Sequence, residues 1–352
     1  MKRINALLLC LALPVLFAGC SGEQLHDMTI VQAVGIDGGT PVTACIQYLD
    51  LNRTAGSTEA LEGNITATQV GEAATLSAAL TEANRSLAGD GFFGQNKLFV
   101  LGKAYAETAL PAFAEYLRCS RDSRPDVLVA MSSTTAREVL QSGVSGARVP
   151  AENTADLITE GEQTALVPSV SVNDLLCRYL NPQSDVYLPV LRADKNAVVP
   201  DGVAVCSGDT LAGVLQDDDA LGFMLAQGKI KKGTLVPGGE SGKQPFEIVR
   251  FRRCSRLAEK DGRLQWRITL KVTLYADREG DADALRRLAE KSLSTATENA
   301  VRQCFLLHSD PFGLSLMAAK DCPDYLERHR DDWRRVLPET DVSCAVSVTL
   351  LQ

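Results

Sequence analysis

Hydrophobic and polar residues alternate in the first part of the chain in a way that predicts strands and then a helix. A period of two runs through residues 28–39 and 42–51, and a weaker extended segment follows at 65–70. After Thr75, a residue type that caps helices, the period becomes helical. One face of this helix carries Leu76, Ala79, Leu80, Ala83 and Leu87. The pattern therefore predicts an antiparallel set of strands followed by an amphipathic helix.

Shorter apolar runs continue up to residue 193. They predict strands at 97–102, 126–132 and 186–193 and helices at 106–117, 134–142 and 171–180. Pro111 either kinks or restarts the first of these helices. Ser171, with Asp174 three residues later, matches a capping box. The stretch 143–168 is polar and rich in small residues, so we expect it to be largely loop.

A change in composition at residues 193–202 predicts a domain boundary, because charged and turn-forming residues gather there. A short hairpin is predicted over 201–216. The acidic run 217–219 then opens a helix whose dipole it complements. A glycine-rich turn region follows at 233–243.

The two longest predicted strands lie at 246–257 and 264–276. The Asp261-Gly262 pair between them is a strong signal for a hairpin turn. One face of the first strand carries Arg250, Arg252, Cys254 and Arg256, and Arg253 lies opposite. Such a face is either an ordinary polar sheet surface or a binding surface for an acidic partner.

The longest predicted helix spans 282–307 and ends before Pro311, which disfavours a helical residue at its preceding position. Its inward face is predicted to carry Leu285, Leu288, Ala289, Leu293, Ala296, Ala300 and Cys304. A last helix at 323–336 and a final strand at 341–351 complete the pattern. Strands gather around helices without regular βαβ repetition, so the predicted class is α+β.

The N-terminus has the pattern of a cleaved export signal. The apolar run 6–17 follows Lys2 and Arg3 and is far shorter than the ~20 residues of a membrane-spanning helix. Ala18 and Gly19 before Cys20 resemble the lipobox of bacterial lipoproteins, in which that cysteine is acylated. An ordinary signal peptide is the alternative. Two acyl chains on Cys20 would anchor the chain firmly, since one alone binds reversibly.

The net charge of the chain limits the kinds of partner that it can bind. The 352 residues include 36 Lys and Arg against 44 Asp and Glu, a net charge of −8. An acidic body argues against a nucleic-acid partner, whose phosphates require clustered cations. It also argues against flat adhesion to anionic lipid. No stretch after the signal is apolar for long enough to span a bilayer.

Eight cysteines remain after the signal and Cys20 are set aside. They are Cys45, Cys119, Cys177, Cys206, Cys254, Cys304, Cys322 and Cys344. An even number in an exported protein permits disulfides. They are widely scattered, however, with no C-x-x-C pair and no histidine at ligand spacing. We therefore favour mostly buried free thiols over a disulfide framework.

Several short motifs resemble catalytic signatures, and each has a simpler interpretation. GDGFFG at 89–94 matches a dinucleotide glycine pattern, but a helix precedes it and a strand follows, the reverse of a phosphate site. We expect a helix cap and turn there. HRD at 329–331 lies in a predicted helix without the other kinase motifs, and the run 217–219 lacks calcium-loop spacing. We predict no catalytic, cofactor-binding or metal-binding residue.

Motifs spread over almost the whole mature chain occur in a recognisable order. The first half contains the lipobox, DMTIVQAVGIDGG, TLSAALTEANRSL, GQNKLFVLGKAYAE and YLRCSRDSRPDVLVAMSSTTAREVL. The second half contains GVAVCSGDTLAGVLQDDDALGFMLAQGKIKKG, the helix ending in SDPFGL, the Trp333 helix and the terminal strand. Each motif is weak alone, and the order makes the set specific. The chain resembles the Ger(x)C family of spore germination lipoproteins.

This resemblance implies three mixed α/β domains of the α+β class, built on largely antiparallel sheets. The expected segments are a signal peptide at 1–19, a lipidated linker at 20–27 and domains at 28–194, 198–242 and 245–352. It also implies a non-enzymatic C subunit of a nutrient germinant receptor, needed for assembly or signalling. Acylated Cys20 would hold it on the outer face of the inner spore membrane, beside an A subunit and a transporter-like B subunit.

Two other functions stay open at this point. A solute-binding lipoprotein of a membrane transporter would show two doubly wound lobes with repeated βα units, which the pattern lacks. A secreted hydrolase would need a nucleophile and base that the motifs do not supply.

Overall fold

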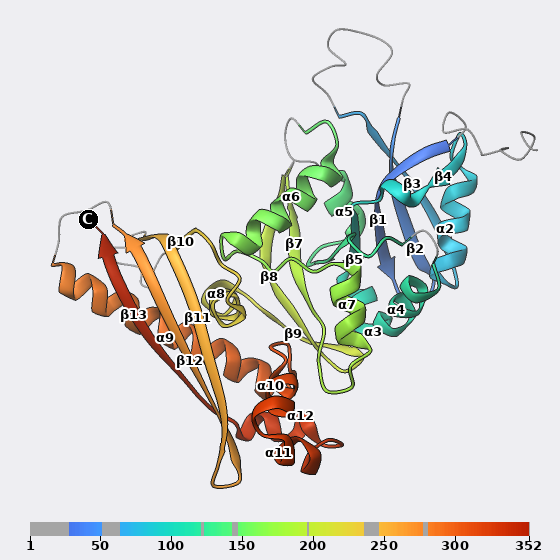
Figure 1. Cartoon of the computed structure of the whole chain (residues 1–352). Coiled ribbons are helices and arrows are strands. Elements are labelled where there is room, and N and C mark those ends of the chain that lie inside the picture. Colours follow the sequence, from blue (N-terminus) through green and yellow to red (C-terminus); the bar gives the residue numbers. More distant parts are fainter. Residues whose placement is uncertain are drawn as a thin grey trace, which may run out of the picture.

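The computed structural model describes residues 28–50, 64–120, 123–142, 147–195, 197–235, 246–276 and 281–351. In these residues the chain forms two sheets, with helices packed on the first and between the two (Figure 1). Antiparallel pairs form both margins of the first sheet and most of the second. The predicted α+β class is confirmed.

The first sheet has the order β3-β2-β1-β5-β6-β7-β8-β9, with β4 beside β1. Its strands are β1 (Met28–Gly38), β2 (Val42–Leu49), β3 (Thr66–Ala73), β4 (Asp90–Phe92), β5 (Leu98–Gly102), β6 (Leu128–Ser132), β7 (Tyr187–Asp194), β8 (Ala197–Ser207) and β9 (Thr210–Leu215). The centre, β1-β5-β6-β7, is parallel. β8 and β9 form the predicted hairpin and extend the sheet at one margin.

Helices cover both faces of this sheet, and β5 is consequently apolar on both sides. Leu98 and Val100 belong to a core cluster with α5 and α6, whereas Phe99 and Leu101 pack in the cluster that includes α2, α3, α4 and α7. These helices are α2 (Leu76–Arg85), α3 (Lys103–Thr108), α4 (Leu110–Cys119), α5 (Ala136–Gln141), α6 (Pro150–Gln163) and α7 (Val172–Tyr179). The first sheet is therefore the buried scaffold of the molecule.

Local sequence signals explain where several of these helices begin. The Thr75 hydroxyl accepts from the N–H of Ala78 and caps α2. Ser171 and Asp174 form the predicted capping box of α7. Pro111 restarts rather than kinks the helix, because the chain breaks between α3 and α4 and the proline lies in the first turn of α4.

Residues 150–163 form α6, so the prediction of a largely loop segment was wrong there. Pro150 lies in the first turn, where its missing N–H has no helical partner to lose. The buried face of the helix carries Pro150, Ala151, Thr154, Ile158 and Gly161. Small and hydroxyl-bearing residues give this face little hydrophobic contrast, which is why the pattern did not reveal the helix.

The second sheet has the order β10-β11-β12-β13. Its strands are β10 (Gly233–Leu235), β11 (Phe246–Lys260), β12 (Arg263–Tyr275) and β13 (Asp341–Leu351). β11 and β12 form the predicted hairpin, in which Asp261 and Gly262 both have positive φ, 52° and 75°. This is the backbone that an Asp-Gly turn favours, and it sets Lys260 opposite Arg263.

Two helices, α8 (Asp217–Gln227) and α9 (Ala282–Leu306), pack together between the sheets (Figure 1). Gly222 permits their close approach, because a Cβ there would overlap the backbone carbonyl of Ala296. Most of the predicted inward face of α9 is buried. Leu288 is 50 % exposed, however, and its prediction was wrong. It lies about 100° around the helix from the buried Ala289, outside the narrow packed stripe.

The open edge of β13 is closed by side chains of α9. Glu298 Oε1 accepts from the N–H of Cys344 at 2.8 Å, and Glu290 Oε1 accepts from that of Val348 at 3.0 Å. Ser294 Oγ donates to the Cys344 carbonyl at 2.7 Å. These bonds satisfy strand groups that would otherwise be available for pairing with another chain.

The last predicted helix, 323–336, is instead two short helices, α11 (Pro323–Arg328) and α12 (Trp333–Val336), after α10 (Leu314–Asp321). A turn separates them. It brings the Trp333 indole N–H to Asp310, to which it donates at 3.1 Å. That buried contact, which periodicity does not encode, explains the break.

The sheet pairing crosses the predicted boundary at 193–202. β8 and β9 belong to the first sheet, and β10 pairs with β11 in the second. The division into domains at 28–194, 198–242 and 245–352 stays a prediction.

Candidate functional site

The predicted lipid-attachment residue, Cys20, lies outside the described residues, as do the signal peptide at 1–19 and the linker at 20–27. In the part of the chain that the structure describes, no helix is long and apolar enough to cross a membrane. The same residues contain no group of three or more His, Cys, Asp or Glu side chains placed to hold a metal ion.

The motif-like runs take structural roles. Residues 90–92 form β4, and the 3₁₀ turn η4 (Phe93–Gln95) follows. The prediction of a helix cap at 89–94 was wrong, because α2 already ends at its C-cap Ser86. The Asn84 side chain accepts from the N–H of Gly91 at 2.8 Å and leaves no room for a Cβ. His329 lies in the turn after α11, beside Asp332, rather than on a helix face. The acidic run 217–219 forms the first turn of α8, as predicted.

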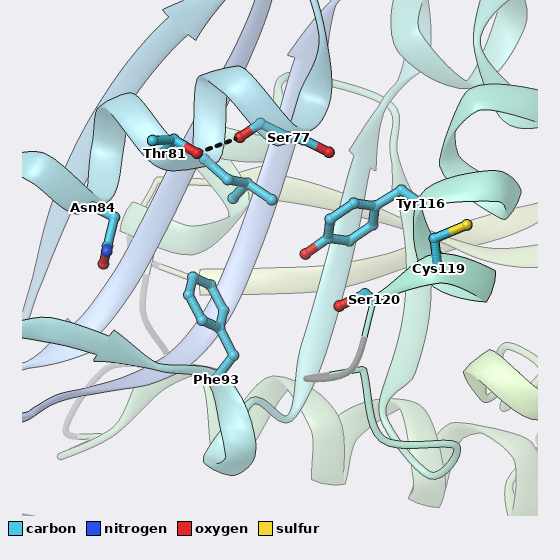
Figure 2. A pocket seen from close by; sticks show the side chains of 8 residues that line it. Ser77, Thr81, Asn84, Phe93, Tyr116, Cys119 and Ser120 are labelled. Carbon is cyan, nitrogen blue, oxygen red and sulfur yellow. Dashed lines mark hydrogen bonds between the residues drawn. The ribbon is translucent and has the colours of Figure 1, made fainter. Parts of the chain in front are cut away.

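A cavity of about 500 Å³ opens between α2, η4 and α4 (Figure 2). Its lining consists of Ser77, Leu80, Thr81, Asn84, Phe93, Tyr116, Cys119 and Ser120. Figure 2 shows Phe93 and Tyr116 pointing toward one another across it. None of these lining side chains is an acid, a base or a histidine. The volume suits a small molecule, and the lining suits a neutral one.

The thiol at the rim of this cavity is not activated. Cys119 donates to Glu115 Oε1 at 3.2 Å, and this hydrogen bond raises the pKa of the thiol. The same carboxylate binds Arg118, and the hydrogen bond from Arg118 lowers the pKa of Glu115. A nucleophilic cysteine needs the opposite environment, one that favours the thiolate. The cavity therefore has the chemistry of a binding pocket.

A buried ionic junction joins the first sheet to the C-terminal helices. The side chain of Asp185, just before β7, is 0 % exposed and lies 2.8 Å from Nη2 of Arg334 on α12. Asp185 also accepts from the N–H groups of Gly208 and Asp310, each at 2.7 Å. A carboxylate removed from water needs this number of donors. The two parts of the chain are thereby held in one arrangement.

The SDPFG segment, residues 309–313, forms the other half of the junction. Asp310 accepts from the N–H groups of Leu314 and Ser315 at 2.7 and 2.8 Å, besides the Trp333 indole. Burial raises the pKa of Asp310, and these donors oppose the shift. The ring of Phe312 packs against those of Phe223, Trp266 and Phe305.

The arginines predicted to share one strand face do so. Arg250, Arg252, Cys254 and Arg256 are exposed on one side of β11, and β12 adds Arg267 and Lys271 on the paired, exposed positions. Arg253 lies on the other side, 5.6 Å from the centre of the Trp266 ring, where burial lowers its pKa. The set Arg250, Arg252, Arg256, Arg267 and Lys271 is called the basic face below.

The eight cysteines in the described residues are all free thiols. Five are buried, namely Cys45, Cys206, Cys304, Cys322 and Cys344. Burial raises the pKa of Cys45 and Cys206 to about 12. The prediction of mostly buried free thiols is confirmed.

Two family models together match most of the chain. Residues 21–193 match the model of the spore germination protein N-terminal domain, and residues 201–352 match that of the spore germination B3/GerAC-like C-terminal domain. A Bacillus subtilis (strain 168) protein named "Putative spore germination protein YfkR" is 19 % identical over 376 residues, covering 100 % of this chain and 97 % of the relative.

A solved structure has the same fold. The crystal structure of the GerBC protein superposes with a TM-score of 0.59 at 16 % identity, covering 91 % of this chain and 97 % of the other. The matches define a two-part spore germination protein. The chain belongs to the Ger(x)C family of spore germination proteins.

Sequence reasoning missed the junction and the cavity. Asp185 and Arg334 are 149 residues apart and look like ordinary charged residues. The SDPFG segment was the available signal, since a short rigid motif after a long helix often has a packing role. The cavity lining is chemically unremarkable in sequence, and only the approach of α2 to α4 brings it together.

Proposed function

We propose that this chain is a non-enzymatic, lipid-anchored subunit of a spore nutrient germinant receptor, needed for receptor assembly or signalling. The observation that carries the proposal is the match of both Ger(x)C domain models, in order, over residues 21–193 and 201–352. Its partners would be the A and B membrane subunits. Its location would be the outer face of the inner spore membrane.

The lipid would be attached at Cys20. Each buried CH₂ group of an acyl chain contributes roughly 0.8 kcal/mol, so two chains hold a protein at a bilayer where one does not. Cys20→Ala would release the chain from the membrane. A variant that stays bound after a salt wash would mean that partner contacts, not the lipid, hold it.

The features found in the described residues suit binding better than catalysis. The cavity is lined by neutral groups, its cysteine is held as a thiol, and the ionic junction holds the C-terminal helices against the first sheet. A rigid body with exposed binding surfaces suits a subunit that couples membrane partners.

The test is a mild-detergent pull-down of the tagged chain from spore membranes, with the co-purifying proteins identified by mass spectrometry. Recovery of two multi-span proteins, one of them transporter-like, is the expected result. Recovery of an ATP-driven permease would instead favour a solute-binding lipoprotein and would overturn the proposal. A Cys20→Ala variant, solubilised in parallel, separates loss of the anchor from loss of the partners.

A further inference from the structure

Among the residues that the structure describes, helices cover the second sheet on one side only. Trp266, Ile268 and Leu270 are buried on the side that faces the core. On the other side, alternate residues of β11, β12 and β13 are exposed along the length of the sheet. Figure 1 shows α9 passing behind these strands, which leaves the opposite side open. The basic face occupies this open side.

The strand register places like charges opposite one another on the basic face. Arg252 pairs with Lys271, and Arg256 pairs with Arg267. Like charges in directly opposed positions destabilise a sheet. None of the five cations forms an ion pair with a carboxylate among the residues that the structure describes. The repulsion is therefore not relieved by this part of the chain.

The basic face is also hollowed and has hydrogen-bonding groups. A groove of about 190 Å³ is lined by Arg250, Arg252, Lys271, Thr273, Ser347 and Thr349, together with Val272. The hydroxyls of Thr349 and Ser347 lie on β13 opposite Thr273 and Lys271. Guanidinium groups beside hydroxyls form a donor-rich surface, which suits carboxylate oxygens.

One end of this face carries three exposed apolar side chains, beside the exposed Glu247, which is paired with Tyr275. Val249, Tyr275 and Leu351 are exposed by 51 %, 39 % and 43 %, although each is a large hydrophobic residue. Tyr275 and Leu351 are paired neighbours on β12 and β13. Tyrosine and arginine are enriched at protein interfaces, where an apolar anchor beside polar contacts is common.

We propose that the basic face binds an acidic polypeptide segment of a partner protein, with an apolar residue of that segment packed against Tyr275 and Leu351. Arg250 and Arg252 are two residues apart on β11, about 6.6 to 6.8 Å, which matches the spacing of alternate side chains in an extended peptide. Arg256 lies four residues beyond Arg252, which is twice that spacing. A membrane surface fits less well, because the chain as a whole carries a net charge of −8 and anionic lipid would repel the rest of it.

The experiment uses the full mature chain in non-ionic detergent and a fluorescein-labelled oligoglutamate peptide that begins with leucine. Fluorescence anisotropy at low salt is expected to show saturable binding that weakens as salt is added. The variant Arg252→Glu/Arg256→Glu is expected to bind about tenfold more weakly or worse, since two attractive contacts become repulsive. Replacing the leucine of the peptide by glutamate should weaken binding by a smaller factor.

A matched control carries the same change in net charge elsewhere. Lys320→Glu/Arg335→Glu alters two exposed cations on α10 and α12, and it is expected to bind the peptide within about twofold of the unaltered chain. Equal losses in the two double variants would mean that binding depends on net charge alone, and would overturn the proposal. Failure of the unaltered chain to bind the peptide at low salt would overturn it as well.

Vesicles of phosphatidylglycerol serve as the competing ligand. If the chain co-sediments with them through the basic face and ignores the peptide, the site recognises lipid and the proposal is wrong. The double variant Arg252→Glu/Arg256→Glu is expected to keep its fold, because each substitution replaces a repulsive pair with Lys271 or Arg267 by an attractive one. A circular dichroism spectrum of the variant checks this. The peptide-binding measurement needs no receptor subunit. Its result can therefore contradict the binding proposal without contradicting the proposed receptor function, and the reverse also holds.

Discussion

The two sheets of this protein differ in how their faces are used. Both sides of the first sheet are covered by helices, and its central strand β5 is buried at every position. The second sheet buries one side against α9 and the core and leaves the other side exposed and basic. A sheet buried on both faces stabilises the molecule and is closed to partners. A sheet buried on one face keeps a rigid surface for recognition.

The contrast is tested most strongly by truncating one residue on each sheet. Phe99→Ala, at a position 2 % exposed in β5, is expected to lower the free energy of unfolding by about 3 to 5 kcal/mol, because it leaves a cavity in the core. Thr269→Ala, on the open side of β12, is expected to change it by less than about 0.5 kcal/mol. Urea unfolding followed by circular dichroism measures both. Similar losses would contradict the assignment of one buried and one open face.

Removal of the ionic junction between Asp185 and Arg334 is expected to cause the next largest loss in the free energy of unfolding. Asp185→Ala leaves Arg334 and the N–H groups of Gly208 and Asp310 without their acceptor, and is expected to lower the free energy of unfolding by about 3 kcal/mol. Asp126→Ala removes a shorter ion pair, at 2.6 Å from Arg124, but the Asp126 side chain is 65 % exposed, so the loss should stay below about 1 kcal/mol. Equal losses in urea unfolding would mean that the junction adds nothing beyond a surface ion pair.

The buried thiols are expected to make the free energy of unfolding fall at alkaline pH. Burial raises the pKa of Cys45 and Cys206 to about 12 from 9.0, and that of Cys344 to about 11. Because the folded pKa is raised, the stabilisation is present below pH 9 and is lost as the pH rises from about 9 toward 12. Each such thiol should lower the free energy of unfolding by about 1.4 kcal/mol per pH unit in this window.

Two substitutions check that assignment. Cys206→Ala should make the alkaline decline shallower, whereas Cys254→Ser, on the open side of β11, should leave the slope unchanged. Unfolding curves recorded across the alkaline window give the slopes directly. A flat profile for the unaltered chain would show that the buried thiols do not control its alkaline stability.

The smallest predicted effect is a gain in the free energy of unfolding, whereas the changes above lower it. Arg252→Glu turns the repulsive pair with Lys271 into an attractive one and is expected to raise the free energy of unfolding by about 0.2 to 1 kcal/mol. Arg252→Gln, which removes the charge without reversing it, should give a smaller gain. A stabilised variant that also binds the acidic peptide less well would mean that the like-charged pair lowers the stability of the sheet and contributes to binding. Destabilisation by Arg252→Glu would contradict the repulsion inferred from the register.

Much of the fold followed from local pattern. The period of two placed β1, β2, β11, β12 and β13, and the capping residues placed the starts of α2 and α7. The helix α6 was missed because its buried face is made of small and hydroxyl residues. Leu288 was misplaced because apolar character alone does not say how wide the packed stripe of a helix is.

The basic face, too, was predicted from the sequence only in part. Alternation along β11 put Arg250, Arg252 and Arg256 on one face, and the Asp261-Gly262 turn fixes which residues of β12 lie opposite them. The element that covers the reverse, apolar face is α9, which comes later in the chain and is not specified by the strands themselves. The cavity beside α4 likewise depends on the packing of separate elements.

For this chain, local sequence set the period, caps and turns of most elements, because these depend on residues a few positions apart. Tertiary structure decided that Asp185 would meet Arg334 across 149 residues, and that one side of the second sheet would stay open. The physical reason is that burial is a property of the assembled layers. A strand with one apolar and one polar side specifies which side turns inward, but only its neighbours determine what covers it and what the other side is free to bind.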